Sequence, residues 1–386
     1  MAKLLKHVYT KSWMARLANT VAENYSDFNT HTFIDSVFDQ NWAARELKAR
    51  QRHIAICLEK NIPEAYLDQL NLICQTASTF ANYTQVTDAE THRSPVKKQT
   101  HTEELGGFET LFFPCFVEEF GPAYPEYYSQ NIQALAYLTQ YASSEFAIRA
   151  FILSEPEKTM QHMLAWAHHE NYHVRRLASE GCRPKLPWAT ALKPFQKNPS
   201  LIWPILERLK NDKSLYVRRS VANNINDIAK DHPAQVLHYC QNWLGKTPNT
   251  DWLIKHGLRT LLKKGDTQAL AMFGFFAPEH IQCTKLQCEP TITRGEKLYF
   301  SFGLSTKEKS LGQCRIEFAI GFMKANGKQT IKVFKLSERH IKQSQIALAK
   351  HYYFKPISTR KYYTGEHSLS IIINGKTLST VYFNLT

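Results

Sequence analysis

The sequence has no glycine-rich phosphate-binding loop, no cluster of histidines and cysteines, and no nucleophile elbow of the kind found in hydrolases. Most common enzyme classes therefore have no support in it. Its eight cysteines include no C-x-x-C pair or other metal-ligand spacing, which favours reduced thiols inside a cell. We expect no metal ion and no cofactor.

Long hydrophobic runs are also missing. The apolar stretch FAIRAFIL (146–153) is interrupted by Arg149 and is far shorter than a transmembrane helix needs. The first residues, MAKLLKHVYTKSW, lack the apolar core of a signal peptide. These absences predict a soluble cytoplasmic protein with no membrane partner.

Acidic residues are few, since 34 Asp and Glu stand against 48 Lys and Arg and leave a net charge of +14. From Ala277 onward there are 17 basic and 7 acidic residues, so a net charge of +10 belongs to this last part and +4 to the rest. Such an excess of bases is typical of proteins that bind polyanions such as nucleic acid. The alternative is a surplus of charge that only aids solubility.

An internal repeat is the clearest pattern in the first two thirds of the chain. The segments YHVRRLASEG (172–181) and LYVRRSVANN (215–224) align without a gap at a spacing of 43 residues. HEAT and armadillo repeats, which are pairs of antiparallel helices, have periods of about 40 to 47 residues. Apolar residues recur at helical spacing and predict one buried stripe per segment. They are Val174, Leu177, Ala178, Val217, Val221 and Ala222.

The pattern of apolar residues divides the chain at about Ala277. Before it we expect helices over 13–23, 30–38, 44–58, 66–79, 145–152, 157–168, 172–180, 200–210, 214–230, 233–244 and 252–264, with a polar loop over 86–104. After it the alternation predicts strands over 297–304, 314–323, 330–334, 368–373 and 380–384, with hairpin signals at Asn326-Gly327 and Asn374-Gly375. The sequence thus predicts a multidomain protein, with an all-α HEAT-like solenoid at 1–277 and a basic all-β immunoglobulin-like sandwich at 278–386.

Acidic residues on the repeat helices are candidates for chemistry. Glu180 lies in the last turn of its helix, where a carboxylate faces the negative end of the helix dipole at a cost of roughly 0.3 to 1 kcal/mol. Asp227 shares a helix face with Asn223, which aligns with Glu180 in the repeat. Glu145 precedes Arg149 by four residues, a spacing that also suits a simple surface pair. For each acid the alternative is a surface carboxylate or a helix cap.

A stiff loop and a set of bases accompany these acids. The loop Arg183-Pro-Lys-Leu-Pro-Trp188 contains two prolines, which fix its path and would hold the indole against a base. Trp188 taken alone would also suit a core position. Other bases recur at the same place in successive helices and suit backbone phosphates, although a solvated polar face is the alternative. They are Arg175, Arg176, Arg218, Arg219 and Lys255.

Three long stretches give the chain a family resemblance: SEFAIRAFI (144–152), HVRRLASEGCRPKLPWA (173–189) and VRRSVANNINDIAKDHP (217–233). Together with ELKARQRHI (46–54) and FFPCFVEEFG (112–121), they make most of the first 270 residues resemble the AlkC group of HEAT-repeat DNA alkylation-repair glycosylases. The basic C-terminal part resembles the immunoglobulin-like extension that part of this group carries.

The resemblance implies excision of the cationic bases 3-methyladenine and 3-methylcytosine from duplex DNA, which leaves an abasic site. It implies a monomeric bacterial-type protein that associates with the nucleoid when engaged. Glu145, Glu180 and Asp227 are then the catalytic acids. The residues expected to contact the lesion or the DNA are Trp188, Arg149, Arg175, Arg176, Arg183, Asn223, Arg218, Arg219 and Lys255.

The residue types agree with this chemistry. A base methylated at N3 is already a cation and leaves without a general acid, so the catalyst has only to stabilise the positively charged sugar, which carboxylates do. Two other interpretations stay open. One is a non-catalytic HEAT-repeat scaffold that binds DNA or protein, and the other is a module that binds anionic membranes or RNA.

Overall fold

The computed structural model describes residues 5–90, 108–357 and 360–386, and the chain forms two compact units. Unit 1 comprises Met1–His232 and Trp243–Gly257, and unit 2 comprises Pro233–Asn242 and Leu258–Thr386. The described part of unit 1 is helical, and unit 2 adds helices to a pair of β-sheets. The predicted fold class, helices followed by sheets, is confirmed.

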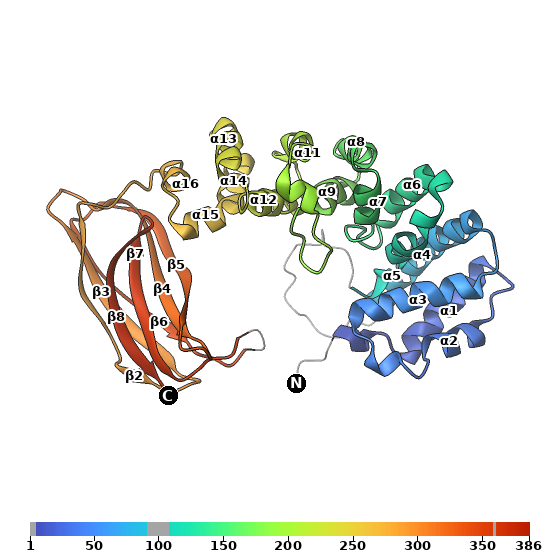
Figure 1. The fold of residues 1–386 in the computed structure, drawn as a ribbon, viewed down its shortest axis with the longest axis horizontal. Helices are drawn as coiled ribbons and strands as arrows, with labels where there is room; N and C mark the ends of the chain where they lie inside the picture. Colours follow the sequence, from blue (N-terminus) through green and yellow to red (C-terminus); the bar gives the residue numbers. More distant parts are fainter. Residues whose placement is uncertain (1–4, 91–107, 358–359) are drawn as a thin grey trace. The chain divides into compact units, whose positions relative to one another are not determined.

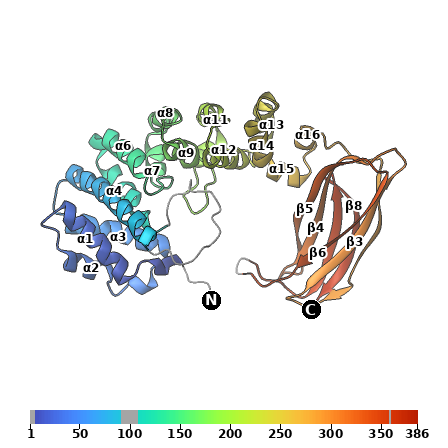
Figure 2. The same ribbon diagram turned by 180° about the vertical axis from the view of Figure 1, so that it is seen from behind.

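Unit 1 is built from helix pairs. Figures 1 and 2 show α8 and α11 in one row and α9 and α12 in a second row beside it. The helices of unit 1 are α1 (Lys11–Asn24), α2 (Thr30–Val37), α3 (Leu47–Asn61), α4 (Tyr66–Glu90), α5 (Phe112–Phe120), α6 (Tyr128–Leu138), α7 (Ile148–Ser154), α8 (Pro156–Trp166), α9 (Tyr172–Gly181), α10 (Lys193–Lys197), α11 (Trp203–Leu209), α12 (Leu215–Ile228) and α14 (Pro248–Gly257).

The buried stripe of the repeat is present as predicted. All six of its residues have side chains with no exposed area: Val174, Leu177, Ala178, Val217, Val221 and Ala222. Gly181 at the end of α9 lets this helix approach α7 closely, because a Cβ on Gly181 would lie 2.5 Å from Ile148 Cγ2 on α7. This contact brings the end of α9 next to the start of α7.

Unit 2 contains the helices α13 (Pro233–Trp243), α15 (Arg259–Lys264) and α16 (Thr267–Ala271). The last residue of α13, Trp243, is assigned to unit 1. Its strands are β1 (Ile281–Cys288), β2 (Thr291–Ile292), β3 (Lys297–Thr306), β4 (Gly312–Met323), β5 (Gln329–Ile341), β6 (Gln345–Tyr353), β7 (Gly365–Ile373) and β8 (Lys376–Leu385). They form a three-stranded sheet in the order β1-β3-β6 and a five-stranded sheet in the order β2-β8-β7-β4-β5. The two sheets enclose one apolar core that includes Phe300, Phe318 and Phe354.

Both predicted hairpin turns join neighbouring antiparallel strands. Asn326-Gly327 connects β4 to β5, and Asn374-Gly375 connects β7 to β8. Asn374 and Gly375 both have positive φ, 45° and 83°, as the tight type I′ turn requires. Gly375 also contacts the backbone of Gly265, where a Cβ on Gly375 would lie 2.7 Å from Gly265 Cα. The hairpin therefore packs directly on the end of α15.

Several predicted segments differ from the structure, and the strand expected over 330–334 extends to Ile341 in β5. The helix expected over 252–264 is divided into α14 and α15, because Leu258 leaves helical geometry with ψ near 4°. The loop expected over 86–104 begins late, since α4 continues to Glu90, and residues 91–104 lie outside the described part of the chain.

Candidate functional site

Arg176 on α9 links two of the predicted catalytic acids. Its Nη1 donates to Glu145 Oε2 at 3.0 Å and to Ser143 Oγ at 2.5 Å. Its Nη2 lies 3.6 Å from Glu180 Oε1, one helical turn further along α9. Glu145 therefore pairs with Arg176, and not with Arg149 as its spacing in the sequence suggested.

Arg183 extends this arrangement to the third acid. Its Nη1 donates to Glu180 Oε1 at 2.6 Å, and its Nε donates to Asp227 Oδ2 at 2.9 Å. Lys230 Nζ donates to the other oxygen of Asp227, also at 2.9 Å. Three carboxylates and three cations thus alternate in one chain of contacts, which we call the carboxylate row: Glu145, Arg176, Glu180, Arg183, Asp227 and Lys230.

The inner acids of the carboxylate row are removed from solvent. Glu180 is 6% exposed and Asp227 is 1% exposed. Burial acts to raise the pKa of Glu180, but Arg176 and Arg183 outweigh it and hold that pKa below its ordinary value. Glu180 is therefore an anion at neutral pH despite its burial.

Hydrogen bonds between successive repeats fix the alignment of α9 with α12, on which the spacing of the carboxylate row depends. The hydroxyls of Ser179 and Ser220 are 2.6 Å apart in the interior. Asn224 Nδ2 donates to the carbonyl of Ser179 at 2.8 Å. These contacts place Glu180 and Asp227 on either side of Arg183. These contacts could not be predicted from the sequence, because small polar residues inside a repeat do not reveal their partners.

The chain leaves α9 in a loop, residues 182–192, that projects clear of both helix rows in Figures 1 and 2. We call it the Trp188 loop. Trp188 is 64% exposed, which excludes the core position considered from the sequence. Its φ is +65°, in the left-handed region that non-glycine residues rarely adopt and that costs of order 1 to 3 kcal/mol. An exposed indole on a strained backbone is a feature that packing alone does not explain.

Arg149 lies beneath this loop and does not reach solvent. It is 2% exposed, and burial lowers its pKa to about 10, so it stays a cation at neutral pH. Its guanidinium donates to the carbonyls of Gly181 at 2.8 Å, Arg183 at 2.9 Å and Thr190 at 2.8 Å. These donors are directed at the backbone, so the expected contact with DNA is replaced by a contact with the loop.

The repeated arginines divide into two kinds. Arg175 donates to both oxygens of Asp212, at 2.7 and 3.0 Å, and to the carbonyl of His169. Arg218 donates to the carbonyls of Asp212 and Lys213 at 2.7 and 2.9 Å. Each therefore ties down the turn before its own helix. Arg219 on α12 is exposed, and Asn223 and Lys255 are half-buried.

The structure adds Lys48 and Glu118 to this region, which the sequence analysis did not identify. Lys48 Nζ donates to the carbonyl of Trp188 at 2.8 Å and lies 4.4 Å from the centroid of the Phe146 ring. Glu118 on α5 is half-buried, and burial raises its pKa while Lys48 acts in the opposite direction. The signal was absent from the sequence because Lys48 and Trp188 are 140 residues apart.

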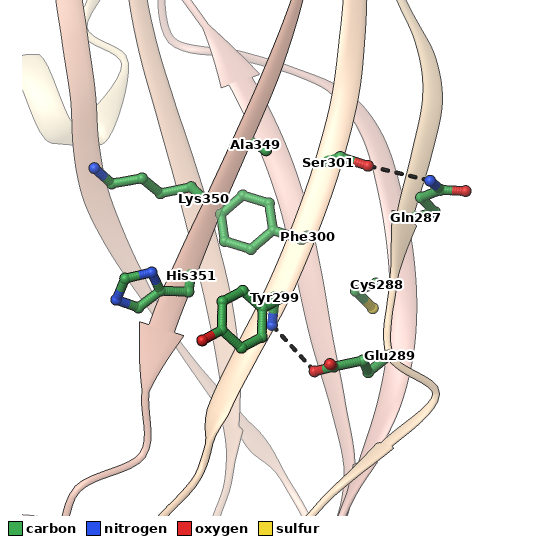
Figure 3. Close-up of a pocket in the computed structure, with 9 residues that line it drawn as sticks. All are labelled: Gln287, Cys288, Glu289, Tyr299, Phe300, Ser301, Ala349, Lys350 and His351. Atoms are coloured by element: carbon green, nitrogen blue, oxygen red, sulfur yellow. Dashed lines mark hydrogen bonds between the residues drawn. The ribbon is translucent and has the colours of Figure 1, made fainter.

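Unit 2 has a hollow of its own on the three-stranded sheet, with a volume of about 600 Å³ (Figure 3). Tyr299 and His351 lie along one side of it, with ring centroids 5.5 Å apart, and Ser301 and Gln287 share a hydrogen bond of 3.2 Å. It contains no paired carboxylates like those of the carboxylate row. We therefore place the candidate chemistry in unit 1.

Within 5–90, 108–357 and 360–386 no three His, Cys, Asp or Glu side chains are grouped so that they would hold a metal ion. No helix among those residues is long and apolar enough to cross a membrane.

Known proteins resemble the whole chain. A family model for the C-terminal immunoglobulin-like domain of the uncharacterised protein YhaZ matches residues 282–386. YhaZ of Bacillus subtilis (strain 168) is 40% identical over 383 residues, which are 99% of each chain. The structure of the Pseudomonas fluorescens alkylpurine DNA glycosylase AlkC, bound to DNA containing an abasic site analog, has a TM-score of 0.89 and 32% identity over 100% of both chains. The prediction of an immunoglobulin-like domain after a helical repeat domain is confirmed.

Proposed function

The chain belongs to the family of the alkylpurine DNA glycosylase AlkC and of YhaZ, and on this basis we propose that it is a DNA glycosylase. Its substrates would be the cationic N3-methylated bases 3-methyladenine and 3-methylcytosine in duplex DNA. Its product would be an abasic site, because hydrolysis by water requires no lysine nucleophile. The observation that carries the proposal is the carboxylate row, together with the exposed and strained Trp188 in the loop that follows α9.

The carboxylate row suits the departure of a cationic base. When the glycosidic bond breaks, positive charge passes from the base to the sugar, so a fixed anion near C1′ stabilises the transition state. At 4 Å and an effective dielectric constant near 20 one carboxylate contributes about 4 kcal/mol of attraction, on the order of a thousandfold in rate. Arg176 and Arg183 offset part of this attraction but keep Glu180 ionised.

The proposed role of each residue follows from its chemical type, its exposure and its contacts. Glu145, Glu180 and Asp227 supply the negative charge, and one of them orients the attacking water. Trp188 is the exposed aromatic surface that meets the lesion or its sugar. Arg176 and Arg183 hold the acids in place, and we assign the phosphate contacts to the cations Arg219 and Lys255 and to the amide of Asn223.

The immunoglobulin-like domain, residues 278–386, is proposed to bind DNA as well. The β4–β5 hairpin and the loop before β7 bring Lys324, Arg360 and Lys361 around one hollow of about 470 Å³. Neighbouring positive charge from Arg360 adds to the effect of burial in lowering the pKa of Lys332. Cations this close repel one another, and bound phosphates would relieve that repulsion. Other exposed bases on the hairpin and its surroundings are Lys328, Lys335, Arg339 and Lys342.

A second candidate function is a DNA-binding scaffold without catalysis. The observation in its favour is that every carboxylate of the row has a basic partner within 3.0 Å, as in a structural ion-pair network. The two functions differ in one result. Incubation with methylated duplex DNA releases free 3-methyladenine if the protein is a glycosylase and releases none if it is a scaffold.

A further inference from the structure

Two cations that the proposed chemistry does not use, Arg149 and Lys48, donate to the backbone of the Trp188 loop. Arg149 binds the carbonyls of Gly181 and Arg183 at the start of the loop and that of Thr190 near its end. Lys48, from α3, binds the carbonyl of Trp188 at the tip. Backbone contacts within the loop are few: Ala189 donates to Leu186 at 3.3 Å and Leu192 donates to Pro184 at 3.1 Å.

We infer that Lys48 is a positioning residue for the reaction, which together with Arg149 fixes the Trp188 loop so that the indole is presented to DNA in a preset orientation. This inference rests on the proposed function. Neither residue needs to touch substrate, because both act on the backbone that carries Trp188. Lys48 thereby makes the N-terminal helices part of the site.

The backbone of Trp188 shows why the loop needs such support. A φ of +65° is unfavourable for a residue with a large side chain, and the indole is 64% exposed, so most of its surface is not packed against the protein. Relaxation of this peptide to negative φ would turn the indole in another direction. The hydrogen bond from Lys48 ends on the carbonyl of this strained residue and therefore opposes that relaxation.

Lys48 also connects the loop to the carboxylate row. Its ammonium group lies 4.4 Å from the centroid of the Phe146 ring, and Phe146 directly follows Glu145. A cation over an aromatic face is held by electrostatic attraction, which restricts the lysine to one direction. Lys48 thus fixes the tip of the loop relative to the segment that carries Glu145.

Exchange of backbone amide hydrogens tests the positioning role in the protein alone. Lys48→Met keeps the aliphatic stem and removes the donors, and we expect amides of residues 183–192 to exchange about tenfold faster while those of α9 and α12 keep wild-type rates. The matched control is Lys60→Met, about three turns further along the same helix. Unchanged exchange in the loop of Lys48→Met overturns the inference, whatever the protein's activity.

Single-turnover excision of 3-methyladenine tests the same inference in the reaction. We expect Lys48→Met to lower the rate about ten- to a hundredfold with little change in DNA affinity, and Lys48→Arg, which can still donate, to recover most of it. In a Trp188→Ala background Lys48→Met should lower the rate no further, because both changes remove the same feature. Independent losses, or a flatter salt dependence of binding, would show that Lys48 acts on DNA directly. A wild-type protein without excision activity refutes the proposed function and leaves the exchange result as the test of positioning.

Discussion

Arg183 and Asp227 form an ion pair across 44 residues of sequence, with Arg183 Nε 2.9 Å from Asp227 Oδ2 in the interior between two repeats. The arginine belongs to the loop after α9, and the aspartate belongs to the last turn of α12. Because Arg183 also binds Glu180, the spacing of the two acids is set by one guanidinium. The proposed chemistry and the stability of the fold therefore depend on the same contacts.

Asp227→Asn is expected to lower both excision and stability. The change leaves Arg183 buried beside a weaker acceptor, and breaking a buried pair costs up to about 3 to 5 kcal/mol of unfolding free energy. The excision rate should fall, but less than in Glu180→Gln, because Asp227, at 1% exposed, is less accessible to DNA than Glu180, at 6%. Urea denaturation and single-turnover kinetics measure the two effects.

Asp231→Asn is the matched control for this variant. Asp231 lies four residues after Asp227, beyond the end of α12, and pairs with Lys185 of the Trp188 loop at 2.7 Å, but both side chains are 30% exposed. Its loss should cost no more than about 1 kcal/mol and lower excision much less than Asp227→Asn does. Equal effects of the two variants would refute the special role of Asp227.

The pH dependence of stability should carry the signature of Glu180. Its pKa in the folded protein is lower than the ordinary value of 4.5, so the ionised carboxylate stabilises the fold above that value. This contribution is lost as pH falls through the lower, folded-state pKa. The wild-type protein should therefore be more stable than Glu180→Gln at pH 7, and the difference in unfolding free energy should shrink below about pH 4.5. A difference that is constant with pH would mean that Glu180 is not an anion in the folded protein.

Deletion of the residues after Ala277 should leave a folded helical domain, since unit 1 has its own buried stripe. The deletion removes the contact of Gly375 with Gly265 and the hydrogen bond from Asn374 Nδ2 to the carbonyl of Phe276, so the helices after Gly257 should be the ones that fray. Circular dichroism and the cooperativity of thermal unfolding measure the result. A truncated chain that aggregates or loses its helicity contradicts a domain boundary near this residue.

Neutralising the bases of unit 2 should weaken DNA binding and make it less dependent on salt. Each lost phosphate contact lowers the slope of log affinity against log salt by roughly 0.9. The test compares the wild-type protein with a variant in which Lys324, Arg360 and Lys361 are replaced by Gln, on a duplex that contains an abasic-site analogue. The control is a variant in which Lys307 and Lys309 are replaced by Gln. Both are exposed in the loop between β3 and β4, and their replacement removes two positive charges where the test variant removes three. An unchanged slope would mean that the charge of unit 2 serves solubility.

Much of the helical architecture could be predicted, because the spacing between the two repeated segments gives the length of one repeat unit. The 43-residue spacing placed α9 and α12 and the buried stripe within a residue or two of their observed bounds. The sandwich was predicted less completely. Strands β1, β2 and β6 were missed. The two residues of β2 are too few to show a pattern, and IQCTKLQC of β1 and QIALAKHYY of β6 are edge strands that mix polar and charged residues with apolar ones.

The candidate site could be predicted in its residue types but not in its pairings. The acids Glu145, Glu180 and Asp227 were chosen from sequence, and the structure brings all three into one row. The partners of the arginines were harder to predict, because an arginine on a repeat helix can bind a phosphate or a backbone carbonyl equally well. Exposure separates these cases, and Arg149 is only 2% exposed because its guanidinium binds the backbone of a loop 32 to 41 residues further along the chain.

The most direct test of the proposed mechanism is the rate at which the protein releases 3-methyladenine from methylated duplex DNA, measured under single-turnover conditions for wild type and Glu180→Gln. The wild-type protein should release the free base. Glu180→Gln should lose up to about a thousandfold in rate while binding abasic-site DNA within a few-fold of wild type, because the neutral isostere keeps the shape and removes the charge. Glu157→Gln, on the exposed surface of α8, should behave as wild type. A Glu180→Gln rate within a few-fold of wild type would contradict the central claim that this carboxylate stabilises the sugar cation.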